Sequence, residues 1–195
     1  MGAIRNILAI IGLIAIGGAA YMYSKVGGDI NAFNQFDPGA KAVYTEMWQK
    51  LKQSGNTADA TVWVYPLADG VSREDAEESM QSAAIEHNIK DVGKLPLSEQ
   101  VELQTGEKQR FLKIYQYCKP TTAMKMVEYS DAFSAYLPCR IAMVQGKDGK
   151  YRLYALNMDM MIYGGKTLPP DLMKAALEVK ETILDIMKRG ASGDF

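Results

Sequence analysis

The chain has 195 residues, 48% of them hydrophobic, with 22 Lys and Arg against 23 Asp and Glu. A near-neutral balance without a basic tract excludes the positively charged footprint of a nucleic-acid binder, so we expect no nucleic-acid partner. Two cysteines and one histidine can build neither a disulfide-dense small fold nor a four-thiolate zinc site. The composition therefore describes an ordered globular domain and specifies no reaction.

The N-terminus carries an uncharged apolar segment, residues 7–23, which ends in Tyr21 and Tyr23. At about 1.5 Å per residue, a helix of this length reaches roughly 25 Å, the short end of what crosses the hydrocarbon core of a bilayer. Tyrosines at its end suit the membrane interface. We therefore predict a transmembrane anchor at residues 1–24, followed by a polar linker at residues 25–36.

A cleaved signal peptide is the alternative for this segment, because Gly18 and Ala20 are small enough for a cleavage site. Basic residues flank the segment on both sides, with Arg5 before it and Lys25 and Lys41 after it, so charge hardly discriminates between the two orientations. Because a short N-terminal segment before one long domain usually inserts with the N-terminus inside, we expect a single-pass protein of the bacterial inner membrane. Its C-terminal domain would lie in the periplasm.

The remaining chain, residues 37–195, alternates between helical and strand-like patterns. Asp37 followed by Pro38 is typical of a helix start, and Asp148-Gly149 is a strong hairpin signal. The order of the elements predicts an α+β fold, a single domain with a mostly antiparallel sheet packed by helices. The expected elements are helices at 37–55, 72–87, 120–137 and 169–190; strands at 61–65, 110–117, 139–145 and 150–156; an extended stretch at 92–104; and a loop at 157–168.

Two cysteine-centred motifs flank the helix expected at 120–137: Tyr117-Cys118-Lys119-Pro120 before it and Leu137-Pro138-Cys139-Arg140-Ile141 after it. At this separation, and with the hairpin that follows, they resemble the bacterial and archaeal family called domain of unknown function 302. The resemblance spans roughly residues 61–163, and Lys119 departs from it, because the family more often has Asn there. It implies a small α+β fold that often dimerises, here in a membrane-anchored member, and no established activity. The signature residues are Cys118, Pro120, Pro138, Cys139 and Arg140.

The two cysteines invite three interpretations: buried structural residues, a disulfide, or a reactive or ligating thiol. If the helix between them joined parallel strands, Cys118 and Cys139 would lie at opposite edges of the sheet, beyond the roughly 7 Å that a disulfide allows between Cα atoms. Because free cysteines are commonly buried, the structural interpretation is favoured.

Three methionines, Met158, Met160 and Met161, cluster after the last strand. Thioethers are soft ligands suited to Cu(I), and Cys139 or His87 could complete such a site. Methionines more often fill irregular gaps in a core, and His87 continues an apolar helical stripe. The weak metal candidates are therefore Met158, Met160, Met161 and His87, and we expect no cofactor.

Aromatic side chains alternate with aliphatic ones along the predicted strands, so both faces of the sheet are expected to be apolar. One face packs on helices, and the other needs a cover: the helix at 37–55, a second subunit or a hydrophobic ligand. The candidate binding face comprises Trp63, Tyr65, Tyr115, Tyr117 and Tyr154.

No catalytic constellation emerges, which favours a protein that is not an enzyme. The leading hypothesis is a membrane-anchored periplasmic accessory or binding module for a membrane complex or an apolar ligand, with a homodimer as a further option. The alternative is a redox or metal-handling protein that uses Cys118, Cys139 and the loop at 158–161.

Overall fold

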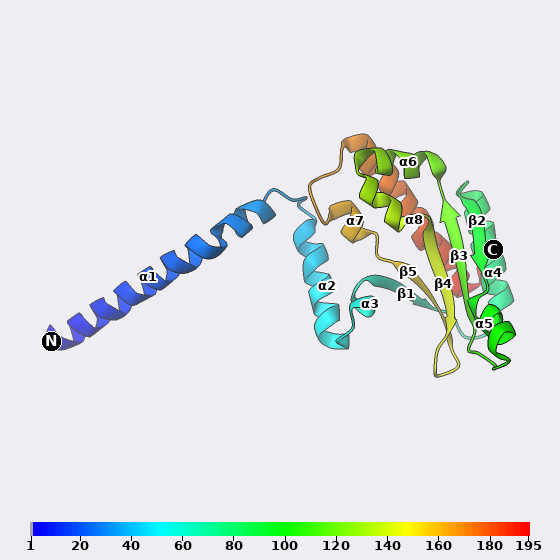
Figure 1. Ribbon diagram of the computed structural model, residues 1–195, viewed down its shortest axis with the longest axis horizontal. Coiled ribbons are helices and arrows are strands. Elements are labelled where there is room, and N and C mark those ends of the chain that lie inside the picture. Colours follow the sequence, from blue (N-terminus) through cyan, green and yellow to red (C-terminus); the bar gives the residue numbers. More distant parts are fainter. Residues whose placement is uncertain (1) are drawn as a thin grey trace.

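The computed structural model describes residues 2–195 as a long N-terminal helix that projects from an α+β domain (Figure 1). This helix, α1 (Gly2–Phe33), contains an exposed apolar window long enough to cross a membrane, a property shared by membrane spans and signal sequences. Residues 25–33, expected in the linker, continue the helix. Gly27 and Gly28 weaken a helix without ending it, and no proline follows before Pro38.

The domain is built on a five-stranded sheet in the order β1-β5-β4-β3-β2. Each neighbouring pair is antiparallel, which confirms the predicted α+β class. The strands are β1 (Val62–Pro66), β2 (Lys90–Leu95), β3 (Leu112–Cys118), β4 (Cys139–Gln145) and β5 (Tyr151–Leu156).

Two helices, α4 and α8, pack against each other and cover one face of this sheet. In Figure 1 α8 lies behind the strands. The helix α2 instead packs on α3 and α7, beside the β1 edge. The bounds are α2 (Ala40–Ser54), α3 (Thr57–Ala60), α4 (Arg73–Glu86), α5 (Leu97–Thr105), α6 (Pro120–Tyr129), the 3-10 helix η1 (Asp131–Tyr136), α7 (Asp159–Tyr163) and α8 (Pro170–Ser192).

The core lies between the sheet and the α4–α8 pair. Met80 of α4 and Ile186 of α8 are fully buried there, and Gly190 lets the two helices approach closely, since a Cβ at that position would lie 2.4 Å from Met80 Cγ. Each large apolar side chain that is fully buried stabilises the fold by about 1.5–3 kcal/mol. The strands contribute Tyr115, Tyr117, Ile141, Met143 and Leu153, each at most 1% exposed.

Some predicted elements differ from the observed ones. Residues 97–104, expected to be extended, belong to α5, because no period-2 alternation follows Pro96 and the segment is rich in good helix formers. The predicted helix at 120–137 divides at Ser130, which is extended, into α6 and η1. The expected loop at 157–168 contains α7.

Two predicted helix ends were also wrong. Asp37 does not cap α2 at its start; its N–H donates to the Gly165 carbonyl and its Oδ1 accepts from the Gly39 N–H, so regular helix begins at Ala40. The last helix passes Gly190 and ends at Ser192, followed by the capping residue Gly193, whose φ of 72° suits glycine. Gly190 is needed for close packing and not for a turn.

Candidate functional site

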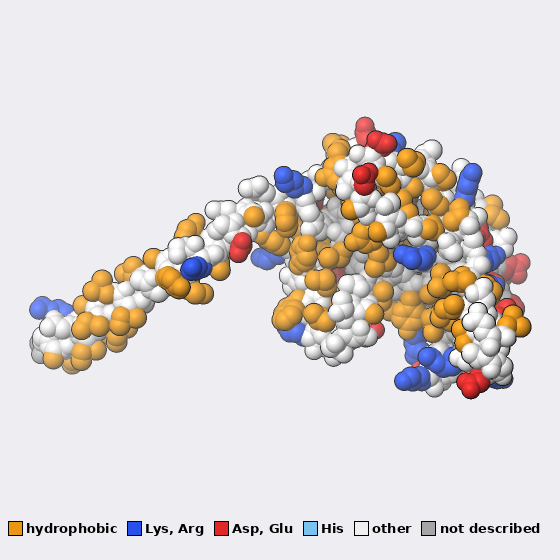
Figure 2. All heavy atoms as spheres, viewed as in Figure 1, with side chains coloured by type: hydrophobic (Ala, Val, Ile, Leu, Met, Phe, Trp, Pro, Cys, Tyr) orange, Lys and Arg blue, Asp and Glu red, His pale blue; other side chains and the backbone are white. Residues whose placement is uncertain are grey.

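Among residues 2–195, no helix covers the central part of the second face of the sheet; α5 packs near the Leu112 end of β3. This second face carries the strand positions that alternate with the core positions, and Figure 2, which shares the view of Figure 1, shows hydrophobic side chains over this part of the domain. Val64 is 43% exposed and Leu156 40%. α2 lies beside β1 and leaves them uncovered, so one of the covers expected from the sequence is excluded. This open face consists of Val62, Val64, Ile114, Ala142, Tyr154 and Leu156.

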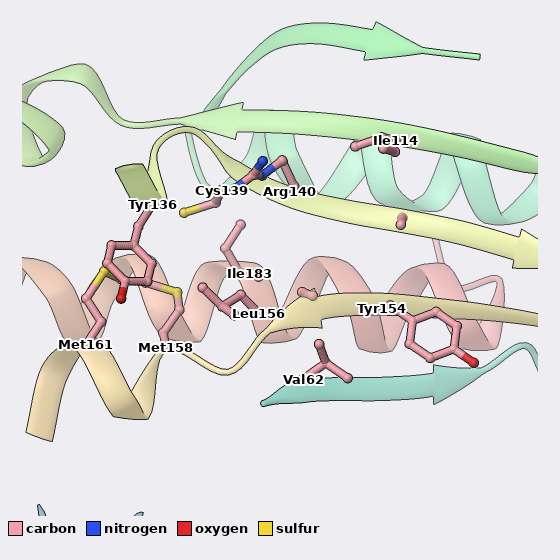
Figure 3. Close-up of a pocket in the computed structure, with 12 residues that line it drawn as sticks. Val62, Ile114, Tyr136, Cys139, Arg140, Tyr154, Leu156, Met158, Met161 and Ile183 are labelled. Atoms are coloured by element: carbon pink, nitrogen blue, oxygen red, sulfur yellow. The ribbon is translucent and has the colours of Figure 1, made fainter. Parts of the chain in front are cut away.

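A cavity of about 320 Å³ opens on this face, where β4 and β5 stop pairing beyond Ile141 and Ala155. Its volume is at the lower end of those that hold small organic molecules. Residues of the open face line one part, and Tyr136, Met158 and Met161 close the end beyond the strands (Figure 3). The cavity is therefore suited to a slender apolar group.

Arg140 is the only charged residue among the twelve that line this cavity. Arg73, Arg152 and Arg189 each form an ion pair, whereas Arg140 forms none with any of residues 2–195. Its guanidinium is exposed beside the apolar lining. An unpaired fork of N–H donors at this position can bind a carboxylate or phosphate.

The five aromatic residues predicted to form one binding face are divided between the two faces. Trp63 pairs with Ala155 and Tyr65 with Leu153, so both lie on the helix-covered side together with Tyr115 and Tyr117. Tyr154 alone lies on the open face. The prediction erred because alternation shows which residues share a face but not which face the helices cover.

Burial also changes the ionisation of the two inner tyrosines. It raises the pKa of Tyr115, as does the neighbouring Glu77 carboxylate, and it raises the pKa of Tyr117. Both phenols are therefore neutral under physiological conditions, and neither is available to an external ligand.

The structure also corrects the expected separation of Cys118 and Cys139. β3 and β4 are antiparallel neighbours with Tyr117 opposite Cys139, so the two cysteines lie at the same end of the sheet. The error came from assuming a parallel crossover. Both are free and partly buried; burial raises the pKa of the Cys118 thiol and raises that of Cys139 to about 11.

A second, smaller cavity of about 40 Å³ lies beneath α6 and beside α8. Sulfur-bearing side chains are prominent in its lining, and three of them also border the larger cavity. The sequence anticipated this gathering in part, through the two cysteines and the methionine cluster, but did not indicate that Met126 of α6 would join them. The five residues are Cys118, Met126, Cys139, Met158 and Met161.

The other weak metal candidates lie elsewhere. His87 ends α4, where its Nε2 is 2.8 Å from Asp185 Oδ2 of α8, and Met160 borders a different surface hollow beside Tyr129 and Lys166. Within residues 2–195 no three His, Cys, Asp or Glu side chains form a group that could hold a metal. Of the methionine cluster, Met158 and Met161 therefore line the two cavities beside the cysteines, and Met160 does not.

The remaining signature residues frame the same end of the sheet. Pro120 is the first residue of α6, a position where its missing N–H costs nothing, and Pro138 precedes β4 after a cis peptide bond. Sequence reasoning placed Arg140 only in the motif. Its unpaired side chain beside an apolar cavity could not be derived without knowing which strands are neighbours.

These features define an α+β domain with one covered and one open sheet face, preceded by a helix apolar enough to span a membrane. The chain belongs to the family described as Domain of unknown function DUF302, whose model matches residues 66–190 and so includes most of α8. Among solved structures it is similar to an uncharacterized conserved DUF302 protein from Bacillus stearothermophilus. The two are 13% identical with a TM-score of 0.53, over 66% of this chain and 97% of that one, which shows a shared fold. Comparison with curated proteins found no match.

Proposed function

We propose that this protein is a membrane-tethered, non-catalytic binding module whose open sheet face holds an anionic amphiphile, such as a fatty acid. The observation that carries the proposal is the apolar cavity of about 320 Å³ with Arg140 as its only charged lining residue. An acyl chain would lie against Ala142, Tyr154 and Leu156, and its headgroup would meet the guanidinium. Burial of each CH₂ group contributes about 0.8 kcal/mol.

The tether fits this role. α1 serves as a single-pass anchor in the inner membrane, with the domain in the periplasm, and it would hold the open face near a lipid surface. Ring contacts connect the helix to the domain: Phe33 lies 5.6 Å from Phe36 and 5.9 Å from Tyr44 between ring centroids. The same tether would also bring the domain close to a membrane-protein partner or to a second copy of this chain.

Ligand binding is tested with the full chain in detergent micelles and decanoate as competitor for a fluorescent fatty acid. Decanol, which lacks the charge, is the matched ligand. A hydrogen bond to a charged group contributes about 1.5–3 kcal/mol, so decanoate should bind about tenfold more tightly than decanol or better.

Two variants separate the charge from the cavity. Arg140→Gln should remove the preference for decanoate, while Ala142→Phe should weaken both ligands by filling the groove. Lys147→Gln, in the β4–β5 hairpin away from the cavity, is the control. Equal affinities for decanoate in the wild type, Arg140→Gln and Ala142→Phe would refute the proposal.

The orientation is tested separately by a reporter at the C-terminus. A phosphatase fusion should be active, because that enzyme folds in the periplasm, and a fluorescent protein that requires the cytoplasm should be dark. The reverse pattern would place the domain in the cytoplasm. Loss of residues 1–20 from the mature protein, found by mass spectrometry, would instead identify a cleaved signal peptide.

A further inference from the structure

The smaller cavity is lined by an unusual concentration of sulfur. Five of its thirteen lining residues, Cys118, Met126, Cys139, Met158 and Met161, carry sulfur, and they come from β3, α6, β4 and the segment around α7. Figure 3 shows the sulfur atoms of Cys139, Met158 and Met161 at the same end of the site, around Tyr136. Residues far apart in the chain thus bring soft donor atoms to one place.

The volume of this cavity limits its occupant. About 40 Å³ exceeds the roughly 10–15 Å³ that one water molecule needs and falls far below the several hundred Å³ of a small-molecule pocket. Water is a poor occupant because it needs two or more polar partners and the lining is mostly apolar. A single ion fits the size.

We propose that this cavity is a Cu(I) site formed by the thiolate of Cys139 and the thioethers of Met158 and Met161. Thiolate and thioether sulfur are soft ligands that suit Cu(I), and thiolates also bind Zn²⁺. On binding, the Cys139 thiol releases its proton to solvent and the sulfur bonds to the ion. One thiolate and one monovalent cation form a neutral unit.

Charge decides between Cu(I) and a divalent ion. Burying an uncompensated charge in an apolar site is costly, and Zn²⁺ with one thiolate would leave a net positive charge there. Lys119, the only charged residue among the thirteen that line this cavity, lies 3.6 Å from Glu178 and so is already paired. The neutral Cu(I) unit avoids this cost.

The site differs from the amphiphile site of the proposed function, although the three ligands border both cavities. Cu(I) would use sulfur and the smaller cavity, whereas the amphiphile would use Arg140 and the open face. Decanoate binding and Cu(I) binding are therefore measured with different probes, and failure of one leaves the other standing.

The test titrates the reduced full chain in detergent micelles with Cu(I) under anaerobic conditions, against a chromophoric Cu(I) chelator. We expect one equivalent to bind. Cys139→Ser should lower the affinity at least a hundredfold, and Met158→Leu and Met161→Leu, which nearly conserve volume, about tenfold each. Met124→Leu, at an exposed position of α6, is the matched control and should bind as the wild type does.

X-ray absorption on the loaded wild-type protein provides a readout that needs no variant to fold. Sulfur-only coordination supports the site. Nitrogen or oxygen ligands, which would point to His87 or to the surface, overturn it. Affinity in Cys139→Ser equal to that of Met124→Leu, or no binding to the wild type, also overturns it.

Discussion

Tyr117 of β3 and Cys139 of β4 are directly opposite each other in the antiparallel pair. Tyr117 is 1% exposed, and Cys139 packs against the same core beneath the sheet. This pairing brings the end of β3 to the start of β4, although α6 and η1 separate them along the chain. It therefore gathers the signature residues and both cavities at one end of the sheet.

Cys139 should react slowly with alkylating agents. A pKa of about 11 leaves on the order of one thiolate in ten thousand at pH 7, and the thiolate is the reactive form. In a Cys118→Ser variant, alkylation of Cys139 at pH 7.5 should be at least a hundredfold slower than that of a free thiol. The rate should rise about tenfold per pH unit up to about pH 11. The same variant in urea is the control, and rapid labelling of the folded form would contradict the buried, neutral thiol.

The folded protein should lose stability in alkaline solution. Burial raises the pKa values of Cys139, Tyr115 and Tyr117, so the folded state retains protons that the unfolded state releases from roughly pH 8.5 to 10 upward. The stabilisation that these protonated groups give the folded state is therefore fully present below this window. It is lost as the pH rises through the window. The melting temperature should fall between pH 8 and pH 10.5, less steeply in Tyr117→Phe, and a flat profile would contradict this.

Gly190→Ala should destabilise the domain by about 1–3 kcal/mol, the usual cost of an overpacked core. The added methyl would meet Met80 Cγ at 2.4 Å, where α8 crosses α4. Urea unfolding measures the loss. Because the two residues are in contact, the double variant with Met80→Ala should cost less than the sum of the single changes.

Gly165→Ala is the control for this substitution. No atom lies within 4 Å of a Cβ there, and its backbone φ is not positive. It should be neutral or slightly stabilising. Equal effects at positions 165 and 190 would show that the loss at 190 does not come from the α4–α8 contact.

The ion pair between Lys180 and Asp159 should hold α7 against α8. Its atoms, Lys180 Nζ and Asp159 Oδ1, are 2.6 Å apart, and the side chains are only 17% and 20% exposed. Such shielding lowers the competition from water, so Lys180→Met should cost about 1–3 kcal/mol. The exposed pair Lys50–Glu46 on α2 is the control, and Lys50→Met should cost about 0.5 kcal/mol or less.

A double-mutant cycle with Asp159→Asn isolates the Lys180–Asp159 pair. A coupling near zero would show that the ion pair does not position α7. Because α7 and its N-cap carry Met161 and Met158, a real coupling should also appear as weaker Cu(I) binding in Lys180→Met.

The sequence alone determined the apolar N-terminal helix, most helix and strand positions and the α+β class, because these depend on local periodicity and on residues such as Ser72, whose side chain and Asp75 cap α4 reciprocally. The signature around Cys118 and Cys139 also identified the family. These features are encoded within short stretches of chain.

Only the tertiary structure decided which strands are neighbours and which face of the sheet α4 and α8 cover. Both depend on contacts between residues distant in sequence, which local patterns do not encode. An antiparallel β3–β4 pair in place of a parallel crossover moves Cys118 from the opposite edge to a place beside Cys139. The same arrangement buries Tyr115 and Tyr117, exposes Tyr154 and leaves Arg140 unpaired beside an apolar cavity.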